Sequence, residues 1–262
     1  MQSDLRGKLV TLFDTKDHKH YFFHIPEKVQ EKASFHTTNG FLLVRDMLTA
    51  GLGSHVTSNI AVPFLLTRPG MYNYIMHGMP RFTQIVYPKD SAYMALRMNI
   101  NEGQHVVEAG TGSGAMSLIL SRFIGPTGRL TTYEKREDFV TRARQNILHY
   151  DSLLQQRIRF ICADVHTGIH ERDVSAVCLD MKDCRPALPA CLEALRPGGY
   201  VAVVAATTNQ VTDLLQFLEN RSVADVEVSE IMLRMYKTVA QRLRPLDTMV
   251  GHTAYMVFAK KK

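Results

Sequence analysis

Hydrophobic and polar positions alternate with two different periods in the chain from residue 104 onward. Apolar runs typical of buried strands lie at residues 104–109, 129–134, 158–162, 174–179 and 199–205. Amphipathic segments typical of helices lie between and after them, at residues 115–123, 136–149, 187–195 and 209–219. Strands that alternate with helices predict a parallel sheet covered by helices, an α/β fold.

The last two apolar runs break this alternation. Val226–Met235 and Thr253–Ala259 have no predicted helix between them. We therefore expect them to pair as an antiparallel hairpin with a long insertion, whereas a nicotinamide-binding domain would usually continue with crossover helices. A doubly wound sheet with this ending is the seven-stranded layout of S-adenosylmethionine-dependent methyltransferases.

Residues 1–65 have the pattern of a small all-β domain. Short strand-like runs separated by turn residues lie at residues 8–13, 20–25, 40–44 and 54–58. This spacing predicts a barrel or curled sheet, followed by a second domain over residues 66–262. Residues 66–98 are expected to connect the two, with the irregular polar part, residues 81–90, closing over a pocket or forming a capped turn. The histidines at 18, 20 and 24 lack the further ligands that a metal site needs, so no metal is expected.

Three glycines at alternate positions follow the first strand of the α/β region. Gly110, Gly112 and Gly114 connect that strand to a helix, and glycine permits positive φ and a close approach of the backbone to a ligand. The spacing fits a dinucleotide or S-adenosylmethionine. Glu108 favours the latter, because a carboxylate can bind a methionine ammonium but repels a pyrophosphate. Glu134, which ends the next strand, is suited to ribose hydroxyls in either case.

Two further acids follow strands of the predicted sheet. Asp164 comes after the third strand and can accept a hydrogen bond from an adenine amine, whereas Asp180 ends the fourth and is placed toward a transferable methyl group. A helix-capping role is the alternative for each.

Composition narrows the class of protein. The chain has 262 residues, 45% of them hydrophobic, and no apolar run approaches the roughly 20 residues of a membrane span. We expect a soluble, intracellular protein, cytoplasmic in a prokaryote. The formal net charge of +6 permits a polyanionic partner, and the four cysteines show no C-x-x-C pair, which argues against zinc and disulfides.

Three segments together resemble one family, the tRNA (adenine-N1)-methyltransferases that modify the T-loop adenosine at tRNA position 58. Residues 81–90 look like the family's Gln-Ile-x-Tyr-Pro-Lys-Asp segment, residues 108–114 are similar to its cofactor loop, and residues 249–253 resemble its C-terminal signature. The small N-terminal β domain also fits. The resemblance implies a class I methyltransferase, S-adenosylmethionine as methyl donor, tRNA as partner and a homotetramer.

The resemblance also implies roles for individual residues. Asp180 would be the catalytic carboxylate, with Tyr87 as a second catalytic residue. The methionine side of the pocket would be lined by Glu108, Gly110, Gly112, Ser113 and Gly114. Gln84, Val86 and Tyr87 would cover it, Glu134 would bind the ribose and Asp164 the adenine. Arg81, Arg244 and His252 would lie near the nucleotide. Separately, we expect phosphate contacts from Arg68, Arg81, Arg242 or Arg244 to offset the cost of displacing the nucleotide from its stack.

One stretch departs from the family. Many members follow the catalytic Asp with a pair of residues and then Pro-Trp, whereas residues 180–186 read Asp-Met-Lys-Asp-Cys-Arg-Pro and the chain has no tryptophan. An RNA-binding subunit without catalytic activity, or a methyltransferase for another RNA adenosine, therefore remain as alternatives. The Asn/Asp-Pro-Pro-aromatic motif of enzymes that methylate exocyclic amines is absent, which favours a ring nitrogen.

Overall fold

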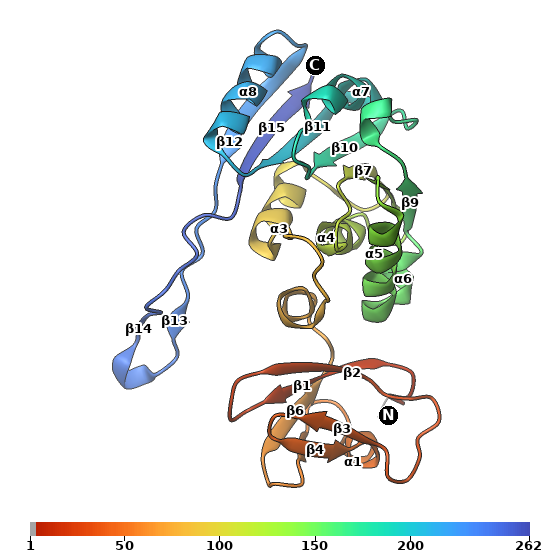
Figure 1. The fold of residues 1–262 in the computed structure, drawn as a ribbon, viewed down its shortest axis with the longest axis vertical. Coiled ribbons are helices and arrows are strands. Elements are labelled where there is room, and N and C mark those ends of the chain that lie inside the picture. Colours follow the sequence, from red (N-terminus) through yellow and green to blue (C-terminus); the bar gives the residue numbers. More distant parts are fainter. Residues whose placement is uncertain (1–3) are drawn as a thin grey trace. The chain divides into compact units, whose positions relative to one another are not determined.

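The computed structural model describes residues 4–262, which form two compact units that divide between Pro80 and Arg81. The first unit is built on antiparallel strands, as its pattern predicts (Figure 1). Its four-stranded sheet has the order β2-β1-β6-β5, and β3 and β4 form a separate hairpin. The strands are β1 (Leu9–Asp14), β2 (His20–His24), β3 (Ser34–Thr37), β4 (Gly40–Leu43), β5 (His55–Thr57) and β6 (Pro63–Thr67).

Two features of the first unit differ from the sequence expectation. A short helix, α1 (Val44–Ala50), interrupts the expected all-β region and buries Val44 and Met47 in the core. The division also falls after Pro80 instead of after residue 65. β6 pairs with β1 beyond that point, and η1 (Tyr74–Gly78), which follows α2 (Met71–Asn73), packs on β2, where the rings of Tyr74 and Phe22 lie 5.5 Å apart. Residues 66–80 therefore belong with the first unit.

The second unit contains a seven-stranded sheet with the order β12-β15-β11-β10-β7-β8-β9. Only β15 runs antiparallel to its neighbours. The strands are β7 (His105–Ala109), β8 (Arg129–Glu134), β9 (Ile158–Cys162), β10 (Val174–Leu179), β11 (Leu195–Ala205), β12 (Val223–Ser229) and β15 (Tyr255–Lys261). The chain order reverses between β7 and β10, so the carboxyl ends of these strands open a crevice suited to a ligand.

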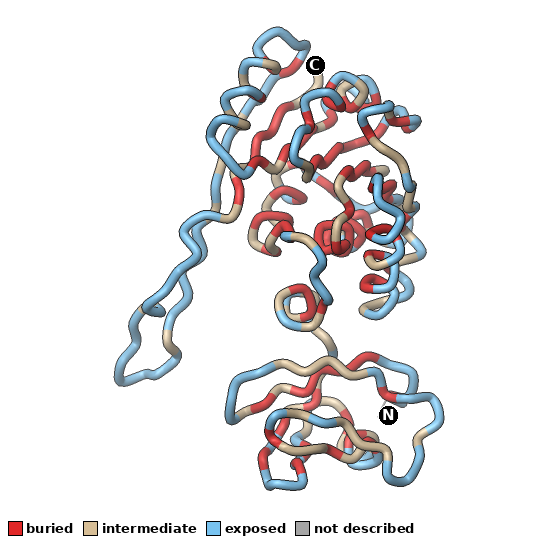
Figure 2. Tube along the Cα trace, in the orientation of Figure 1, coloured by how far each residue is buried: buried red, intermediate tan, exposed pale blue. Residues whose placement is uncertain are grey.

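Helices cover both faces of this sheet (Figure 1). One face carries α3 (Pro88–Arg97), α4 (Ala115–Phe123), α5 (Glu137–Tyr150) and α6 (Ser152–Gln155), and the other carries α7 (Leu188–Ala194) and α8 (Thr208–Glu219). Alternate strand residues such as Val107, Val177 and Val203 pack with Leu188 and Leu214 of α7 and α8. The period-two pattern of the strands thus fills two apolar layers. The inner strands β7, β8 and β10 are mostly buried, whereas the edge strands β9 and β12 are largely exposed or half-buried (Figure 2).

Residues 230–254 form an arm between β12 and β15. The arm contains the short strands β13 (Tyr236–Lys237) and β14 (Arg244–Pro245), which pair with each other, and the turn η4 (Ala240–Arg242). It extends from the edge of the sheet and is mostly exposed (Figure 2). The predicted antiparallel pair is confirmed, but its first strand ends at Ser229 instead of Met235.

None of the helices in residues 4–262 has both the length and the apolar character needed to cross a membrane.

Candidate active site

Each glycine of the turn between β7 and α4 has positive φ: +94° at Gly110, +53° at Gly112 and +85° at Gly114. A Cβ at Gly110 would lie 1.9 Å from the backbone oxygen of Asp180, and one at Gly112 would lie 2.9 Å from Thr83 Oγ1. The turn therefore requires glycine both for its conformation and for the close approach of neighbouring segments.

The segment that precedes α3 packs directly on this turn. The Phe82 amide donates to Ser113 Oγ at 3.0 Å, and the hydroxyls of Thr83 and Ser113 lie 3.3 Å apart. The chain then runs through Gln84 to Tyr87, which is the N-cap residue of α3. Residues 82 and 83 thus pack over the glycine turn, and helix α3 begins at Pro88 without the side-chain cap of the expected capped turn.

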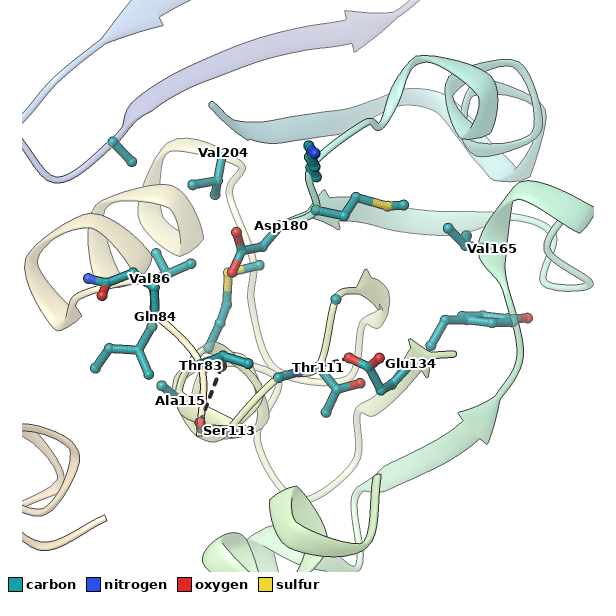
Figure 3. A pocket seen from close by; sticks show the side chains of 18 of the residues that line it. Thr83, Gln84, Val86, Thr111, Ser113, Ala115, Glu134, Val165, Asp180 and Val204 are labelled. Atoms are coloured by element: carbon teal, nitrogen blue, oxygen red, sulfur yellow. Dashed lines mark hydrogen bonds between the residues drawn. The ribbon is translucent and has the colours of Figure 1, made fainter. Parts of the chain in front are cut away.

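A cavity of about 690 Å³ opens at the carboxyl ends of the central strands. Figure 3 shows Gln84, Val86 and Val204 at one end, Glu134 and Val165 at the other, and Asp180 between them. Most of the residues expected at the site line this cavity: Gln84, Val86, Tyr87, Gly110, Gly112, Ser113, Glu134, Asp164 and Asp180. The parallel topology explains why strand ends far apart in sequence meet here.

Glu134 has the geometry of a hydrogen-bond acceptor at the floor of the cavity. Its carboxylate is held by two backbone amides, with Gly112 N donating to Oε2 at 3.2 Å and Arg136 N donating to Oε1 at 3.1 Å. The side chain is nearly buried. Because each carboxylate oxygen has two lone pairs, both keep capacity for a ligand hydroxyl.

Asp164 has the capping role that was its alternative, and it also lies in the cavity lining. Its Oδ1 accepts from His166 N at 3.0 Å and so caps the turn η2 (Val165–Thr167), while the residue also lines the cavity. His166 in turn reaches Asp183 O through Nε2 at 2.8 Å. The cap therefore links the strand end of β9 to the loop that follows Asp180.

Asp180 points its carboxylate into the middle of the cavity (Figure 3). Its amide donates to Ala109 O at 2.9 Å, which fixes the backbone beside Gly110. Burial raises the pKa of Asp180 to about 6, because a charged carboxylate loses hydration there. The group is thus close to its titration point under mildly acidic conditions and ionised at neutral pH.

Glu108 does not line the cavity, contrary to the expected contact with a methionine ammonium. The alternation of β7 turns its side chain toward α4, where Ser117 Oγ donates to Oε2, and the side chain is fully buried. Burial raises the pKa of Glu108 to about 8, so it is predominantly protonated at neutral pH. Gly114 also lies outside the cavity, packed against Ala143 and Ile147 of α5.

The three expected nucleotide-binding residues lie away from the cavity lining. Arg81 is exposed at the start of the second unit, and Arg244 pairs with Asp247 in the arm. His252 lies at the base of the arm, with Nδ1 2.6 Å from Glu230 Oε1 and Nε2 3.2 Å from Ala206 O. Its ring therefore anchors the arm.

Sequence reasoning missed several residues that line the cavity. Gln210 forms a capping box with Thr207 at the start of α8 and donates from Nε2 to Lys182 O at 2.9 Å. The Thr-x-x-Gln spacing of residues 207–210 carried that signal. Thr253 and Asp90 also line the cavity, and their contact depends on long-range folding that no local pattern shows.

The model of the family "tRNA methyltransferase complex GCD14 subunit" matches residues 65–249 of the chain. The chain belongs to this family. The matched residues include the glycine turn, the acids at the strand ends and most of the arm. Among residues 4–262, no group of three or more histidine, cysteine or acidic side chains is arranged to hold a metal.

Individual relatives agree with the family assignment. A protein of Methanocaldococcus jannaschii named tRNA (adenine(57)-N(1)/adenine(58)-N(1))-methyltransferase TrmI is 29% identical over 82% of this chain and 84% of its own length. The crystal structure of the tRNA (m1A58) methyltransferase TrmI from Aquifex aeolicus is 32% identical, with a TM-score of 0.83 over 98% of each chain.

A second solved structure is similar over the same length but differs in its described chemistry. The protein is described as a SAM-dependent O-methyltransferase from Thermotoga maritima and is 36% identical, with a TM-score of 0.90 over 98% of this chain and 95% of its own. The expected fold, a seven-stranded class I methyltransferase sheet with a small N-terminal β domain, is confirmed by these structures.

Proposed function

We propose that this GCD14 family member transfers a methyl group from S-adenosylmethionine to N1 of the adenosine at position 58 in the T loop of tRNA. The observation that carries the proposal is the cavity itself. A glycine turn, an acceptor carboxylate at Glu134 and a half-buried carboxylate at Asp180 meet at the carboxyl edge of a methyltransferase sheet. The tRNA substrate and the N1 position are supported by the names of the relatives in Methanocaldococcus jannaschii and Aquifex aeolicus.

The cavity fits the methyl donor in size and in donor and acceptor groups. Its volume, about 690 Å³, lies within the usual range of small-molecule sites. Glu134 would accept hydrogen bonds from the ribose hydroxyls and Asp164 one from the adenine amine. Gly110, Gly112 and Ser113 would bring backbone against the methionine part, and Gln84, Val86 and Tyr87 would close that end.

The sulfonium methyl is an electrophile that needs a nucleophile in line with its bond to sulfur. Adenine N1 has an in-plane lone pair, so the chain does not have to remove a proton from it before attack. The task of Asp180 is electrostatic. Its ionised carboxylate would accept a hydrogen bond from the exocyclic amine and stabilise the positive charge that develops on the base. Tyr87, which also lines the cavity, would fix the plane of the base.

The altered sequence after Asp180 changes the surface offered to the base. Met181 lines the cavity next to Asp180, and the flexible, polarisable thioether packs well against an aromatic face. We infer that Met181 takes the place of the aromatic platform of many family members. The loop is held by contacts from His166 and Gln210, so it is ordered without a tryptophan.

The nucleotide must leave its stack to reach Asp180, which costs a few kcal/mol. Lys135, Arg136 and Lys182 line the cavity and are suited to bind phosphates of the displaced strand. Phosphate contacts from Arg68, Arg81, Arg242 and Arg244 remain predictions. Binding to tRNA is expected to weaken steeply with salt, because bound cations on the RNA are released.

The test is to incubate the purified chain alone with S-adenosylmethionine and an unmodified tRNA transcript, and then to identify the product by nucleoside mass spectrometry. The proposal requires 1-methyladenosine, and its loss from a transcript with guanosine at position 58. A ribose-methylated product would favour the oxygen chemistry named for the Thermotoga maritima structure. Absence of product with donor bound would favour a non-catalytic RNA-binding subunit.

A further inference from the structure

Lys89 connects the arm to the start of helix α3 through three short hydrogen bonds. Its Nζ donates to Asp90 Oδ1 at 2.7 Å, to Thr253 Oγ1 at 2.6 Å and to Ile231 O at 2.6 Å. An ammonium group has three protons, and each has an acceptor here. Ile231 lies on the outgoing leg of the arm and Thr253 on the returning leg, so one side chain holds both legs.

Asp90 completes this group, which we call the arm clamp and define as Lys89, Asp90 and Thr253. The second oxygen of Asp90 accepts from Thr253 Oγ1 at 2.8 Å. The side chain of Asp90 is 1% exposed and that of Lys89 is 13% exposed. The single hydroxyl proton of Thr253 goes to Asp90 while its oxygen accepts from Lys89, so every proton of the clamp has a defined acceptor.

The arm clamp also forms part of the cavity wall. Asp90 and Thr253 line the cavity, together with Tyr87, whose backbone oxygen accepts from the amides of Asp90 and Ser91. Tyr87 follows Val86 directly in the chain, and Figure 3 shows Val86 on the side of the cavity away from Glu134 and Val165. The position of this wall therefore depends on where the legs of the arm are held.

Helix α3 has a second attachment to the sheet, away from the clamp. Arg97, near the other end of the helix, donates from Nε to Glu227 at 2.8 Å and forms an ion pair with Asp225 at 3.2 Å. Arg97 does not line the cavity. A buried ion pair is a poor source of stability compared with apolar packing of the same volume, and its better-attested role is to fix one geometry.

We propose that Lys89 is a positioning residue for methyl transfer, which fixes the cavity wall at Tyr87 and Thr253 by holding both legs of the arm. This inference rests on the proposed function. It predicts that the clamp sets the placement of the methyl acceptor and of the methionine end of the donor, while the ribose and adenine contacts at Glu134 and Asp164 are independent of it. It also predicts that displacement of the arm changes turnover.

The test uses the double variant Lys89→Met/Asp90→Asn, which removes both charges and leaves no unpaired buried ion. We expect kcat with saturating tRNA to fall by about tenfold to a hundredfold, as for a misplaced reactant. The dissociation constant for S-adenosylmethionine, measured by calorimetry, should rise by a smaller factor than kcat falls, because the ribose and adenine contacts at Glu134 and Asp164 remain. Lys89→Arg, which keeps a cation with several donors, should recover part of kcat.

Arg97→Met is the matched control, since it removes a cation from the same helix without touching the cavity. It should lower the melting temperature and leave kcat unchanged. The proposal is overturned if the double variant keeps wild-type kcat, or if Arg97→Met loses as much kcat as the double variant does.

Hydrogen exchange gives a readout that does not depend on activity. In Lys89→Met/Asp90→Asn, exchange should become faster at residues 84–90 and in both legs of the arm together, and it should not in Arg97→Met. Unchanged exchange in the double variant would overturn the coupling. If the wild-type chain methylates no tRNA, the proposed function fails, and exchange alone decides whether the clamp holds the wall.

Discussion

At Asp180, burial favours the protonated carboxyl group, whereas the proposed chemistry needs the ionised carboxylate. Burial raises the pKa of its carboxyl to about 6, whereas the chemistry needs the carboxylate. A raised pKa means that the folded chain binds this proton more tightly than the unfolded chain does. Asp180 therefore lowers stability as the pH rises from the ordinary aspartate value through about 6, and it retains that cost at neutral pH.

Replacement of Asp180 by Asn is expected to separate activity from stability. The variant should lose roughly 10²- to 10³-fold in kcat, because the charge that stabilises the cationic base is gone. Its melting temperature at neutral pH should rise, because a buried charge has been removed, and calorimetry should still detect S-adenosylmethionine. Equal kcat in the variant and the wild type would exclude Asp180 as the catalytic carboxylate.

The pH dependence of the wild-type enzyme follows from the same group. The value of kcat/KM for S-adenosylmethionine should fall as the pH drops through about 6, where the free enzyme gains a proton on Asp180. The acidic limb of the kcat profile should lie at lower pH, because a bound sulfonium favours the carboxylate. A kcat/KM profile of the same shape in Asp180→Asn would assign the acidic limb to another group.

Gly110 is the glycine of the turn with the least space for a side chain. In Gly110→Ala the new Cβ would meet the backbone oxygen of Asp180, so β7 and β10 must separate at the catalytic end. We expect loss of stability beyond the roughly 1–3 kcal/mol of backbone strain, together with loss of kcat. Gly103→Ala, also at positive φ but with its nearest atom at 3.5 Å, supplies the strain-only comparison in thermal unfolding and activity. Equal losses in the two variants would contradict the steric account.

The strand-end acids of the cavity could be predicted from sequence, whereas the direction of an individual side chain could not. Glu134 and Asp180 follow apolar runs, and a parallel sheet brings the ends of such runs to one edge. Glu108 lies in the same kind of run. Because successive side chains of a strand point to opposite faces, its side chain lies beneath the glycine turn and contacts Ser117. Its burial and raised pKa depend on α4, which local sequence does not reveal.

At the scale of elements, the structure explains why two separate sequence segments occur together. The Tyr-Pro-Lys-Asp segment supplies Lys89 and Asp90, and the Gly-His-Thr segment supplies Thr253. The hydrogen bonds of Lys89 and Asp90 are complete only when Thr253 is present, and those of Thr253 only when Lys89 and Asp90 are present. The spacing of 163 residues between Asp90 and Thr253 is why the contact was invisible to periodicity and motif spacing.

His252 is expected to make the attachment of the arm sensitive to pH. Glu230 and the carbonyl oxygen of Ala206 each accept from one ring nitrogen, which raises the pKa of His252, while Lys89 opposes the rise and Tyr255 packs against the ring. The stabilising effect of the protonated His252 ring on the attachment of the arm is present below the ordinary histidine pKa. It is lost as the pH rises through the raised pKa of His252. Protease cleavage of the arm, normalised to an unfolded substrate, should increase with pH in the wild type and be independent of pH in His252→Asn. The same pH dependence in both would contradict this role.

The apolar pattern predicted the ends of helices and strands less well where apolar residues are exposed at the surface. The run Val226–Met235 was expected to be one strand, but the chain leaves the sheet after Ser229 and carries Met232 and Met235 into the exposed arm. In addition, β6 lies in a proline-bounded stretch that was not predicted to be a strand. The pattern of apolar residues does not show whether a given apolar side chain is buried in the core or exposed at the surface.

On the scale of the whole molecule, the arm carries a concentration of exposed apolar side chains. Met232 and Leu243 are each 68% exposed, and further exposed apolar residues of the arm are Leu233, Met235, Tyr236, Val239, Leu246, Met249 and Val250. An exposed apolar patch of this kind marks a contact surface. We propose that it supports the homo-oligomer, a tetramer, which the family resemblance implies.

Sedimentation tests this proposal directly. The wild-type chain should sediment as an oligomer, and the double variant Met232→Ser/Leu243→Asp should sediment at a smaller mass, because the change removes apolar area and adds a charge. Leu96→Ser is the control, since Leu96 is 72% exposed but lies on helix α3. A wild-type monomer, or an unchanged mass in the arm variant, would contradict the proposal.

The proposed methyl-donor site is tested most directly by a crystal structure of the protein with S-adenosylmethionine bound. We expect the methionine part against Gly110 and Gly112, the ribose hydroxyls on Glu134, and the sulfonium methyl facing the carboxylate of Asp180. An empty glycine turn, or a methyl group directed away from Asp180, would contradict both the donor site and the tRNA methylation that depends on it.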